Sequence, residues 1–342
     1  MSLTMLRAGV RYRPSALLVL PGLALLVGLL ALLDGLYGAR TISPVALWGA
    51  LTSFDPANFD HQILVRIRLP RVAAALLVGA GLGMSGLILQ SLLRNPLGEP
   101  QILGLNAGAS LAVVLTTALP LGATFAGPLR PLVAAGGGGL LFLLVIAMAS
   151  AGRTGMTATK AAFCGIALSA LASTLTSGIL LLDEETLNTI RVWLVGDLSV
   201  AALSDIQAAL PVFLLALLAI VPITQRLNIL ALGDAAATGL GVPVARTRLL
   251  GLTAAALLCG AAVSVAGPIG FVGLVVPALS HRLTGGDHRL SMPTAALLGT
   301  ALLLLADFAG RAAFQPNELA TGLMTAFVGA PVFISVVLRR IK

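Results

Sequence analysis

The sequence predicts an all-α, polytopic membrane protein with about ten transmembrane helices. Of its 342 residues, 58% are apolar and only 10% are charged, and the mean hydropathy is +1.02. A soluble domain of this length would carry about 25% charged residues, and its interior could not bury this much apolar surface. A bilayer can solvate it. The 38 glycines and the 4% aromatic content also suit membrane helices, because small residues let helix backbones approach closely.

Charge-free stretches of the chain predict the individual helices. A helix that crosses a bilayer needs roughly 20 mainly apolar residues. Residues 249–281 are too long for one crossing, and Gly267-Pro268 interrupts them, because proline removes a hydrogen-bond donor. They are therefore expected to form a helix, a turn and a shorter return helix, which makes ten spans in one transmembrane domain over residues 1–342. The stretches are 14–33, 72–93, 100–129, 131–152, 161–182, 206–225, 249–281, 290–306 and 319–338.

The distribution of charge predicts the orientation. Arginines precede the first stretch, and Arg339-Arg340-Ile341-Lys342 follow the last, so both termini are expected in the cytoplasm. With ten spans, 14 of the 21 basic residues fall on the inner side and 10 of the 13 acids on the outer side, whereas nine spans would spoil this partition. The apolar run that ends at Leu33 is too long for a signal peptide, so it is expected to be an uncleaved first helix.

Several classes of function are disfavoured by what the sequence lacks. The net charge of +8 comes without a long basic run, so it indicates topology rather than nucleic-acid binding. Cys164 and Cys259 lie in separate apolar spans and are interpreted as packing residues. No catalytic dyad, metal cluster or G-x-x-x-x-G-K-[ST] loop occurs, so no catalytic residue, metal ligand or cofactor site is expected, and ATP would have to act elsewhere.

The expected spans also carry no ionisable residue near their middles. A carrier coupled to protons or sodium usually keeps such a group inside its bundle. The nearest acids, Asp34, Asp307 and Glu318, fall at the ends of spans. This favours a pore powered by another subunit over an ion-coupled secondary transporter, although backbone carbonyls could bind sodium. A signalling or assembly subunit that moves no solute is the other alternative.

Motifs in order along the chain point to a known family. Residues 40 to 340 resemble the FecCD-type permease family of ABC importers for ferric siderophores, haem and cobalamin. Ala278 and Ala320 depart from that family's usual pattern, which puts only local geometry in doubt. The resemblance is carried by Arg68-Leu-Pro-Arg71, Arg94-Asn95-Pro96-Leu97-Gly98-Glu99-Pro100, Gly104-Leu-Asn106-Ala-Gly108, Leu230-Ala-Leu-Gly233-Asp234, Gly239-Leu-Gly241-Val-Pro243, Gly267-Pro-Ile-Gly270-Phe271-Val-Gly273-Leu-Val-Val-Pro277 and Gly329-Ala330-Pro331-Val-Phe333.

The resemblance implies a type II ABC importer permease in a bacterial inner membrane. Its expected partners are a second permease copy, identical or related, two cytoplasmic ATPase subunits that bind ATP and magnesium, an extracytoplasmic binding protein and membrane lipid. Ferric siderophore is the expected cargo because it is the commonest in the family, and haem and cobalamin stay open. The pore lining is expected to be bland and apolar, with specificity mainly in the binding protein.

Three arginines are the expected docking residues for the binding protein. The resemblance implies that Arg68, Arg71 and Arg311 grip acidic side chains on its two lobes. A guanidinium offers carboxylates a planar, bidentate fork that lysine lacks. The alternative is that these arginines anchor helix ends at the lipid headgroups.

Two cytoplasmic segments are further candidates. Residues 230–243 carry small side chains that could form a short helix in a groove of the ATPase, or else an ordinary loop. The turn after Arg94 and the loop before the fifth span match the family's cytoplasmic gate, but a helix-ending turn would look similar. Glycines at 79, 83, 104 and 108, spaced by four, are expected to pack helices closely. The coupling candidates are Gly233, Asp234, Ala235, Ala236, Gly239 and Gly241, and the gate candidates are Asn95, Leu97, Ala158 and Thr159.

Overall fold

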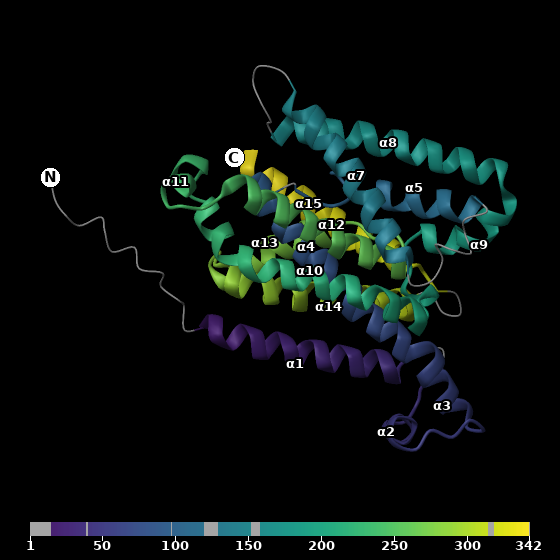
Figure 1. The fold of residues 1–342 in the computed structure, drawn as a ribbon. Coiled ribbons are helices and arrows are strands. Elements are labelled where there is room, and N and C mark those ends of the chain that lie inside the picture. The colour runs from purple at the N-terminus through teal and green to yellow at the C-terminus, as the bar shows by residue number, and fades with distance from the viewer. Residues whose placement is uncertain are drawn as a thin grey trace.

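The chain folds into a bundle of long helices (Figure 1). The structure is a computed structural model, and it describes residues 15–38, 40–96, 98–119, 129–151, 158–313 and 318–341; in these ranges it contains helices and turns but no strand. The longer helices are α1 (Ser15–Leu36), α4 (Leu69–Leu93), α5 (Leu105–Ala118), α7 (Arg130–Ser150), α8 (Ala158–Leu182), α10 (Leu203–Leu230), α12 (Val244–Ala266), α13 (Val272–Thr284), α14 (His288–Ala313) and α15 (Thr321–Ile341). The short ones are α2 (Pro44–Thr52), α3 (Phe59–Ile63), η1 (Leu64–Arg68), α9 (Glu184–Leu194), η3 (Leu198–Val200) and α11 (Asp234–Gly239).

Seven helices within the described ranges are long and apolar enough to cross a membrane. They include α1, α7, α8, α10, α12 and α14, and a continuous helical segment from Phe59 to Leu93 that contains α4. Helices α5, α13 and α15 lie in the three other ranges that the sequence predicts as spans. The all-helical, multi-pass class is therefore confirmed, and the count of ten spans stays a prediction.

Helix boundaries follow from local backbone chemistry. The predicted break at Gly267-Pro268 is confirmed, because α12 ends at Ala266 and α13 begins at Val272. Gly267 has φ +76°, and a Cβ there would lie 1.8 Å from the Trp193 carbonyl oxygen, so only glycine fits. The range 100–129 was expected to be one helix, but α5 starts only at Leu105, after Gly104 in a left-handed conformation.

Helix α4 forms the centre of the bundle, where it packs against α12, α13 and α14 (Figure 1). Added Cβ atoms at Gly79, Gly83 and Gly86 would lie 2.6, 2.4 and 2.2 Å from backbone atoms of facing helices. At Gly108, the corresponding distance to the carbonyl oxygen of Gly137 in α7 is 2.4 Å. The predicted packing role of Gly79, Gly83 and Gly108 is therefore confirmed. Gly104 instead lies at the N-cap of α5, because its positive φ turns the chain into the helix.

The two ends of the bundle differ. The start of α1, the end of α15 and the protruding α11 lie at one end, which we call the α11 end (Figure 1). Helices α2, α3 and α9 lie at the other, the α9 end. The segment between α1 and α4 lies outside the predicted spans, yet it contains α2 and α3, and its core includes Ile42, Ala50 and Leu64.

Candidate functional site

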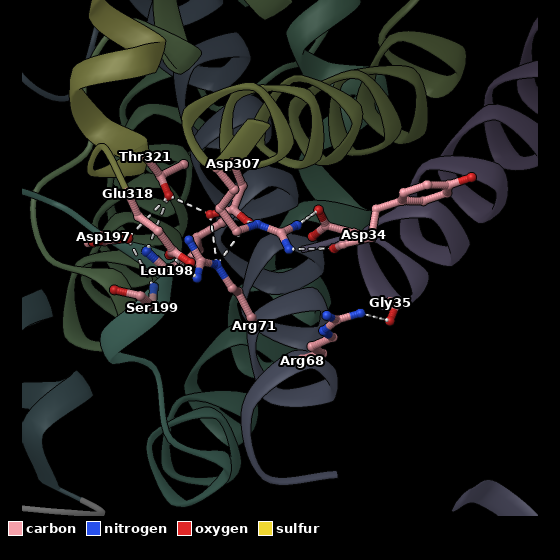
Figure 2. Close-up of polar contacts among 12 residues, drawn as sticks. Asp34, Gly35, Arg68, Arg71, Asp197, Leu198, Ser199, Asp307, Glu318 and Thr321 are labelled. Carbon is pink, nitrogen blue, oxygen red and sulfur yellow. Dashed lines mark hydrogen bonds and ion pairs between the residues drawn. The ribbon is translucent and has the colours of Figure 1, made fainter. Parts of the chain in front are cut away.

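Buried charges join several helices at the α9 end (Figure 2). We call Asp34, Arg71, Asp307, Arg311 and Glu318 the arginine–aspartate cluster. Arg71 Nε lies 2.9 and 2.8 Å from the two carboxylate oxygens of Asp307, and Arg71 Nη1 lies 2.8 Å from Glu318 Oε2. Arg311 pairs with Asp34, and its Nε lies 3.2 Å from Asp307 Oδ2. Asp307 therefore serves both guanidiniums.

The cluster ties the start of α4 to the ends of α1 and α14 and to the start of α15. Thr321, in the first turn of α15, donates to Asp307 across 2.9 Å. The side chain of Asp307 is fully buried, whereas that of Glu318 is 43% exposed. Removing one partner of a buried pair costs about 3–5 kcal/mol, while an exposed pair contributes about 0–1 kcal/mol. Glu318 is therefore the partner most easily released.

The three predicted docking arginines lie close together but are engaged within the chain. Arg68 Nη1 donates to the Gly35 carbonyl across 2.7 Å, and its Nη2 donates to the Arg40 carbonyl. A Cβ at Gly38 would touch the guanidiniums of both Arg68 and Arg311. Arg68, Arg71 and Arg311 are only 6%, 6% and 7% exposed. Their docking role stays a prediction, and it would require the release of internal partners.

The predicted short helix in the cytoplasmic connection is confirmed as α11. Asp234 opens it and pairs with Arg94, which follows α4, and with Arg248 of α12, whose Nη2 lies 2.9 and 3.1 Å from the carboxylate oxygens. Gly233 and Gly241 flank the helix with φ +112° and +79°. Ala237 is buried, whereas the remaining surface of α11 is exposed. The exposed coupling candidates on α11 are Ala235, Ala236 and Gly239.

The predicted gate residues fall at two helix ends. Asn95 lies in the turn after α4, where its carbonyl accepts from the Gly98 N–H across 3.0 Å. Ala158 and Thr159 begin α8, and Thr159 is exposed. Leu97 lies outside the described residues. The gating role of these residues stays a prediction.

A groove with polar walls runs along α5, α8, α13 and α15. It consists of two cavities of about 460 and 430 Å³ that share Gln101 and Ser169, and we call it the polar groove. Polar and apolar side chains both line this surface, and the bland, apolar pore lining expected from the sequence stays a prediction. The polar groups that line it are Glu99, Gln101, Asn106, Ser110, Ser169, Ser173, Thr176 and Ser177.

The spacing of serine and threonine residues in α8 is a feature of the sequence from which the groove could have been predicted. Residues 169, 173, 176 and 177 are all serine or threonine, and their spacing places them on one face of a helix. Hydropathy averages hide this face, because hydroxyl residues count as only weakly polar among leucines and alanines. A search for hydroxyls at helical spacing would have found it.

Two of these hydroxyls have no hydrogen-bond partner among the described residues. Ser110 Oγ and Ser169 Oγ are buried without a hydrogen bond, and each such group costs about 1–3 kcal/mol when it is left unsatisfied. Asn106, by contrast, donates to the Ile269 carbonyl across 3.2 Å and lies 3.1 Å from Cys259 Sγ. The two serine hydroxyls are therefore free to bond water or a solute in the groove.

Glu99 contributes the charge of the groove. It lies between α4 and α5, is only 4% exposed, and its carboxylate accepts a hydrogen bond from the backbone N–H of Phe271. Burial raises the pKa of Glu99 to about 7. Phe271 has φ +67°, which is uncommon for a residue with a side chain. Strained residues of this kind concentrate at functional sites.

These features together define a class of protein. A multi-pass helical bundle with a polar groove along its helices, and with distinct structures at its two ends, has the architecture of a transport permease. The model of the FecCD transport family matches residues 23–339. The chain therefore belongs to the FecCD transport family.

Characterised relatives match along nearly the whole chain. The ferric enterobactin transport system permease protein of Escherichia coli is 39% identical over 95% of this chain and 96% of its own length. The hemin transport system permease protein of Yersinia pestis is 39% identical, over 94% of this chain and 96% of its own. The iron(3+)-hydroxamate permease FhuB of Bacillus subtilis is 35% identical, over 93% and 82%.

Solved structures share the fold. A metal-chelate type ABC transporter, described in an inward-facing conformation, has a TM-score of 0.78 at 30% identity, and the match covers 94% of this chain and 99% of that one. PsaBC of Streptococcus pneumoniae, solved with a Fab, has a TM-score of 0.58 at 17% identity over 78% and 89% of the two chains. The second likeness concerns the fold alone.

Proposed function

We propose that this chain is the membrane-spanning permease subunit of an ABC importer that carries an iron chelate, with ferric siderophore as its cargo. Separate ATPase subunits supply the energy, and an extracytoplasmic binding protein delivers the chelate. The observation that carries the proposal is the polar groove, because it offers a solute hydrogen bonds along helices that are otherwise apolar. The relatives, which transport ferric enterobactin, hemin and iron(3+)-hydroxamate, support the cargo class.

The groove also supports a second permease copy. Unsatisfied hydroxyls and a carboxyl group would be unfavourable against lipid, and polar groups at membrane depth normally face a water-filled cavity or protein. Exposed apolar side chains flank the groove, among them Ile166 on α8 and Ile334 on α15. A second copy that covers this face would enclose the groove as a pore and shield it from lipid.

The two ends of the bundle suit the two other partners. At the α11 end, small exposed side chains and the flanking Leu232 and Leu240, 68% and 63% exposed, offer the ATPase a compact apolar contact. Asp234 anchors this contact to α4 and α12 through Arg94 and Arg248. At the α9 end, Arg71 offers an acidic side chain of the binding protein a cationic partner once Glu318 is released. In this proposal the protein lies in a bacterial inner membrane, with the α11 end and both termini on the cytoplasmic side.

Haem and cobalamin remain the alternative cargoes of the same machine. A secondary transporter is the second candidate function, because Glu99 is an ionisable group in the groove, where an ion-coupled carrier would need one. The two mechanisms differ in their inhibitors. Uptake by an ABC importer is blocked by vanadate, whereas uptake by an ion-coupled carrier is abolished by an ionophore and insensitive to vanadate.

The test is uptake of labelled ferric siderophore, haem and cobalamin by cells with and without this gene. We expect deletion to abolish ferric siderophore uptake alone and a plasmid copy of the gene to restore it, in a vanadate-sensitive manner. Loss confined to haem or cobalamin would keep the importer and change its cargo. Unchanged uptake of all three, in a strain without a second permease of this kind, would contradict the proposal.

A further inference from the structure

The polar groove contains one ionisable side chain. Among the described residues that line it, Glu99 alone can carry charge, and no arginine, lysine or histidine lies with it. We propose that this carboxylate makes the groove a charge filter, which passes neutral or cationic ferric chelates of the hydroxamate class and retards polyanionic chelates. The inference rests on the proposed function and names the cargo class of the same site.

The charge of Glu99 has no counter-ion among the described residues of the groove. The contact that holds its carboxylate is the backbone N–H of Phe271, which is a dipole and not a cation. Charges act on one another strongly where the surroundings have a low dielectric constant. An ionised Glu99 therefore attracts an ammonium group in the groove and repels an anion, while a protonated Glu99 is neutral to both.

The chemistry of ferric chelates makes this filter selective. Three singly charged hydroxamates cancel the charge of ferric iron, so their complex is neutral, and a pendant ammonium group makes it a cation. Three doubly charged catecholates leave the complex a trianion. A lone carboxylate thus separates two classes of chelate that present similar oxygen-rich surfaces.

The hydroxyls of the groove suit the same cargo. Ser110 Oγ and Ser169 Oγ are buried donors without a partner in the part of the chain that the structure describes, and the carbonyl and N–O oxygens of a hydroxamate are acceptors. Ser169 and Gln101 line both cavities, and Glu99 and Gln101 line the same one. A chelate in the groove can therefore meet the hydroxyl donors and the carboxylate together.

The hydrogen bond from Phe271 also fixes the position of the Glu99 carboxylate. Phe271, which donates to it, holds a left-handed backbone conformation at the start of α13. On its other side Phe271 packs against α15, where a Cβ added at Gly329 would lie 2.3 Å from the Phe271 Cβ. Glu99 is thus held by a residue fixed between two helices, as selective sites require of their supporting residues.

A matched pair of linear ferric tris-hydroxamates tests the filter, one with a terminal ammonium group and one with that group acetylated. Uptake of each is measured in cells that express the wild type, Glu99→Gln or Glu99→Asp, and is divided by the binding protein's separately measured affinity for that chelate. We expect the ammonium-to-acetyl ratio to fall about tenfold in Glu99→Gln, through loss of a charge-assisted interaction. Glu99→Asp keeps the charge and should keep the preference.

Ser169→Lys gives a second, independent reading. It leaves Glu99 and its contact with Phe271 in place and adds a cation to the groove, so it should lower the same ratio. If Glu99→Gln fails to reach the membrane, this variant decides. An unchanged ratio in the variants that transport would overturn the charge filter. Absence of ferric chelate uptake by the wild type would instead overturn the proposed function.

Discussion

Several charged side chains of this protein are buried, at positions where a charge usually lowers the stability of the fold. Arg71 and Arg311 share Asp307 in a buried cluster, and such clusters are seldom more stable than a well-packed apolar replacement. Glu99 lies buried, and its carboxylate accepts a hydrogen bond from the backbone N–H of Phe271. Buried charged groups that lower the free energy of unfolding in this way are candidates for a functional role.

Glu318 is predicted to compete with the binding protein for Arg71. Its half-exposed carboxylate lies 2.8 Å from Arg71 Nη1, where an acid of a docked partner would bind. We expect Glu318→Gln to tighten binding-protein affinity by up to about tenfold, because the internal competitor loses its charge. Arg71→Gln should weaken that affinity. Equal affinities in both variants and the wild type, measured in nanodiscs, would leave the cluster a purely structural role.

Glu99 is predicted to make stability depend on pH. Its pKa is about 7 in the folded chain and 4.5 in its unperturbed state, so the folded protein holds the proton more tightly. Stability therefore falls as pH rises from about 4.5 through about 7, by about 3 kcal/mol in total. Thermal unfolding in detergent should show Glu99→Gln more stable than the wild type at pH 8, with the difference shrinking toward pH 5. A difference independent of pH would contradict the burial argument.

The sequence could predict the positions of the cluster arginines but not their partners. Arg71 and Asp307 are 236 positions apart along the chain, and no local pattern pairs them. Glu99 belongs to a recognised motif, yet the N–H that its carboxylate accepts from belongs to Phe271, far along the chain at the start of α13. Such contacts arise from tertiary structure, and they cannot be predicted from one sequence that is read without an alignment to its relatives.

At the scale of helices, the sequence predicts far more than it does for contacts between single residues. Charge-free stretches predicted most helices, because a bilayer imposes both length and composition. Boundaries differed where one residue redirects the backbone, as Gly104 does before α5. The run of four glycines at 136–139 contains Gly137 and Gly138, which face α5 at distances that a side chain would prevent.

Glycine contacts in α4 are predicted to be critical for stability. A Cβ at Gly79 would lie 2.6 Å from backbone atoms of Gly299 and Thr300 in α14, and the backbone cannot easily yield. We expect Gly79→Ala to destabilise the protein by about 1–3 kcal/mol, as overpacking does. Gly178→Ala on α8 is the matched control, because a Cβ there meets nothing within 4 Å. Equal unfolding temperatures for the two variants would contradict the close approach of α4 and α14.

Helix α11 is predicted to transmit motion from the ATPase. A Cβ at Gly239 meets nothing within 4 Å, so a large side chain there fits the isolated chain and obstructs only a partner. Gly239→Trp should therefore reach the membrane in normal amounts and lower uptake by about tenfold or more, while ATP hydrolysis continues. Gly22→Trp on α1, which is equally unobstructed, is the control. Unimpaired uptake in Gly239→Trp would exclude α11 from the coupling contact.

At the scale of the whole molecule, the structure fixes which segments share an end of the bundle. Helix α10, from Leu203 to Leu230, carries the chain from the region of α9 to α11 (Figure 1). The arginines beyond its end, Arg246 and Arg248, obey the positive-inside rule if α11 is cytoplasmic. A cytoplasmic α11 end therefore stays a prediction from the distribution of arginine and lysine.

Cysteine labelling can test that orientation. The native thiols are Cys259, which is buried, and Cys164, which is partly exposed, so a Cys164→Ser background removes the reactive one. We expect a membrane-impermeant maleimide to label Glu184→Cys in intact spheroplasts and Thr238→Cys only after permeabilisation. The reverse pattern would invert the protein and assign α11 to the binding protein's side. Labelling of both from one side would mean that α10 does not cross the membrane, which its 28 residues, about 42 Å of helix, make physically unfavourable.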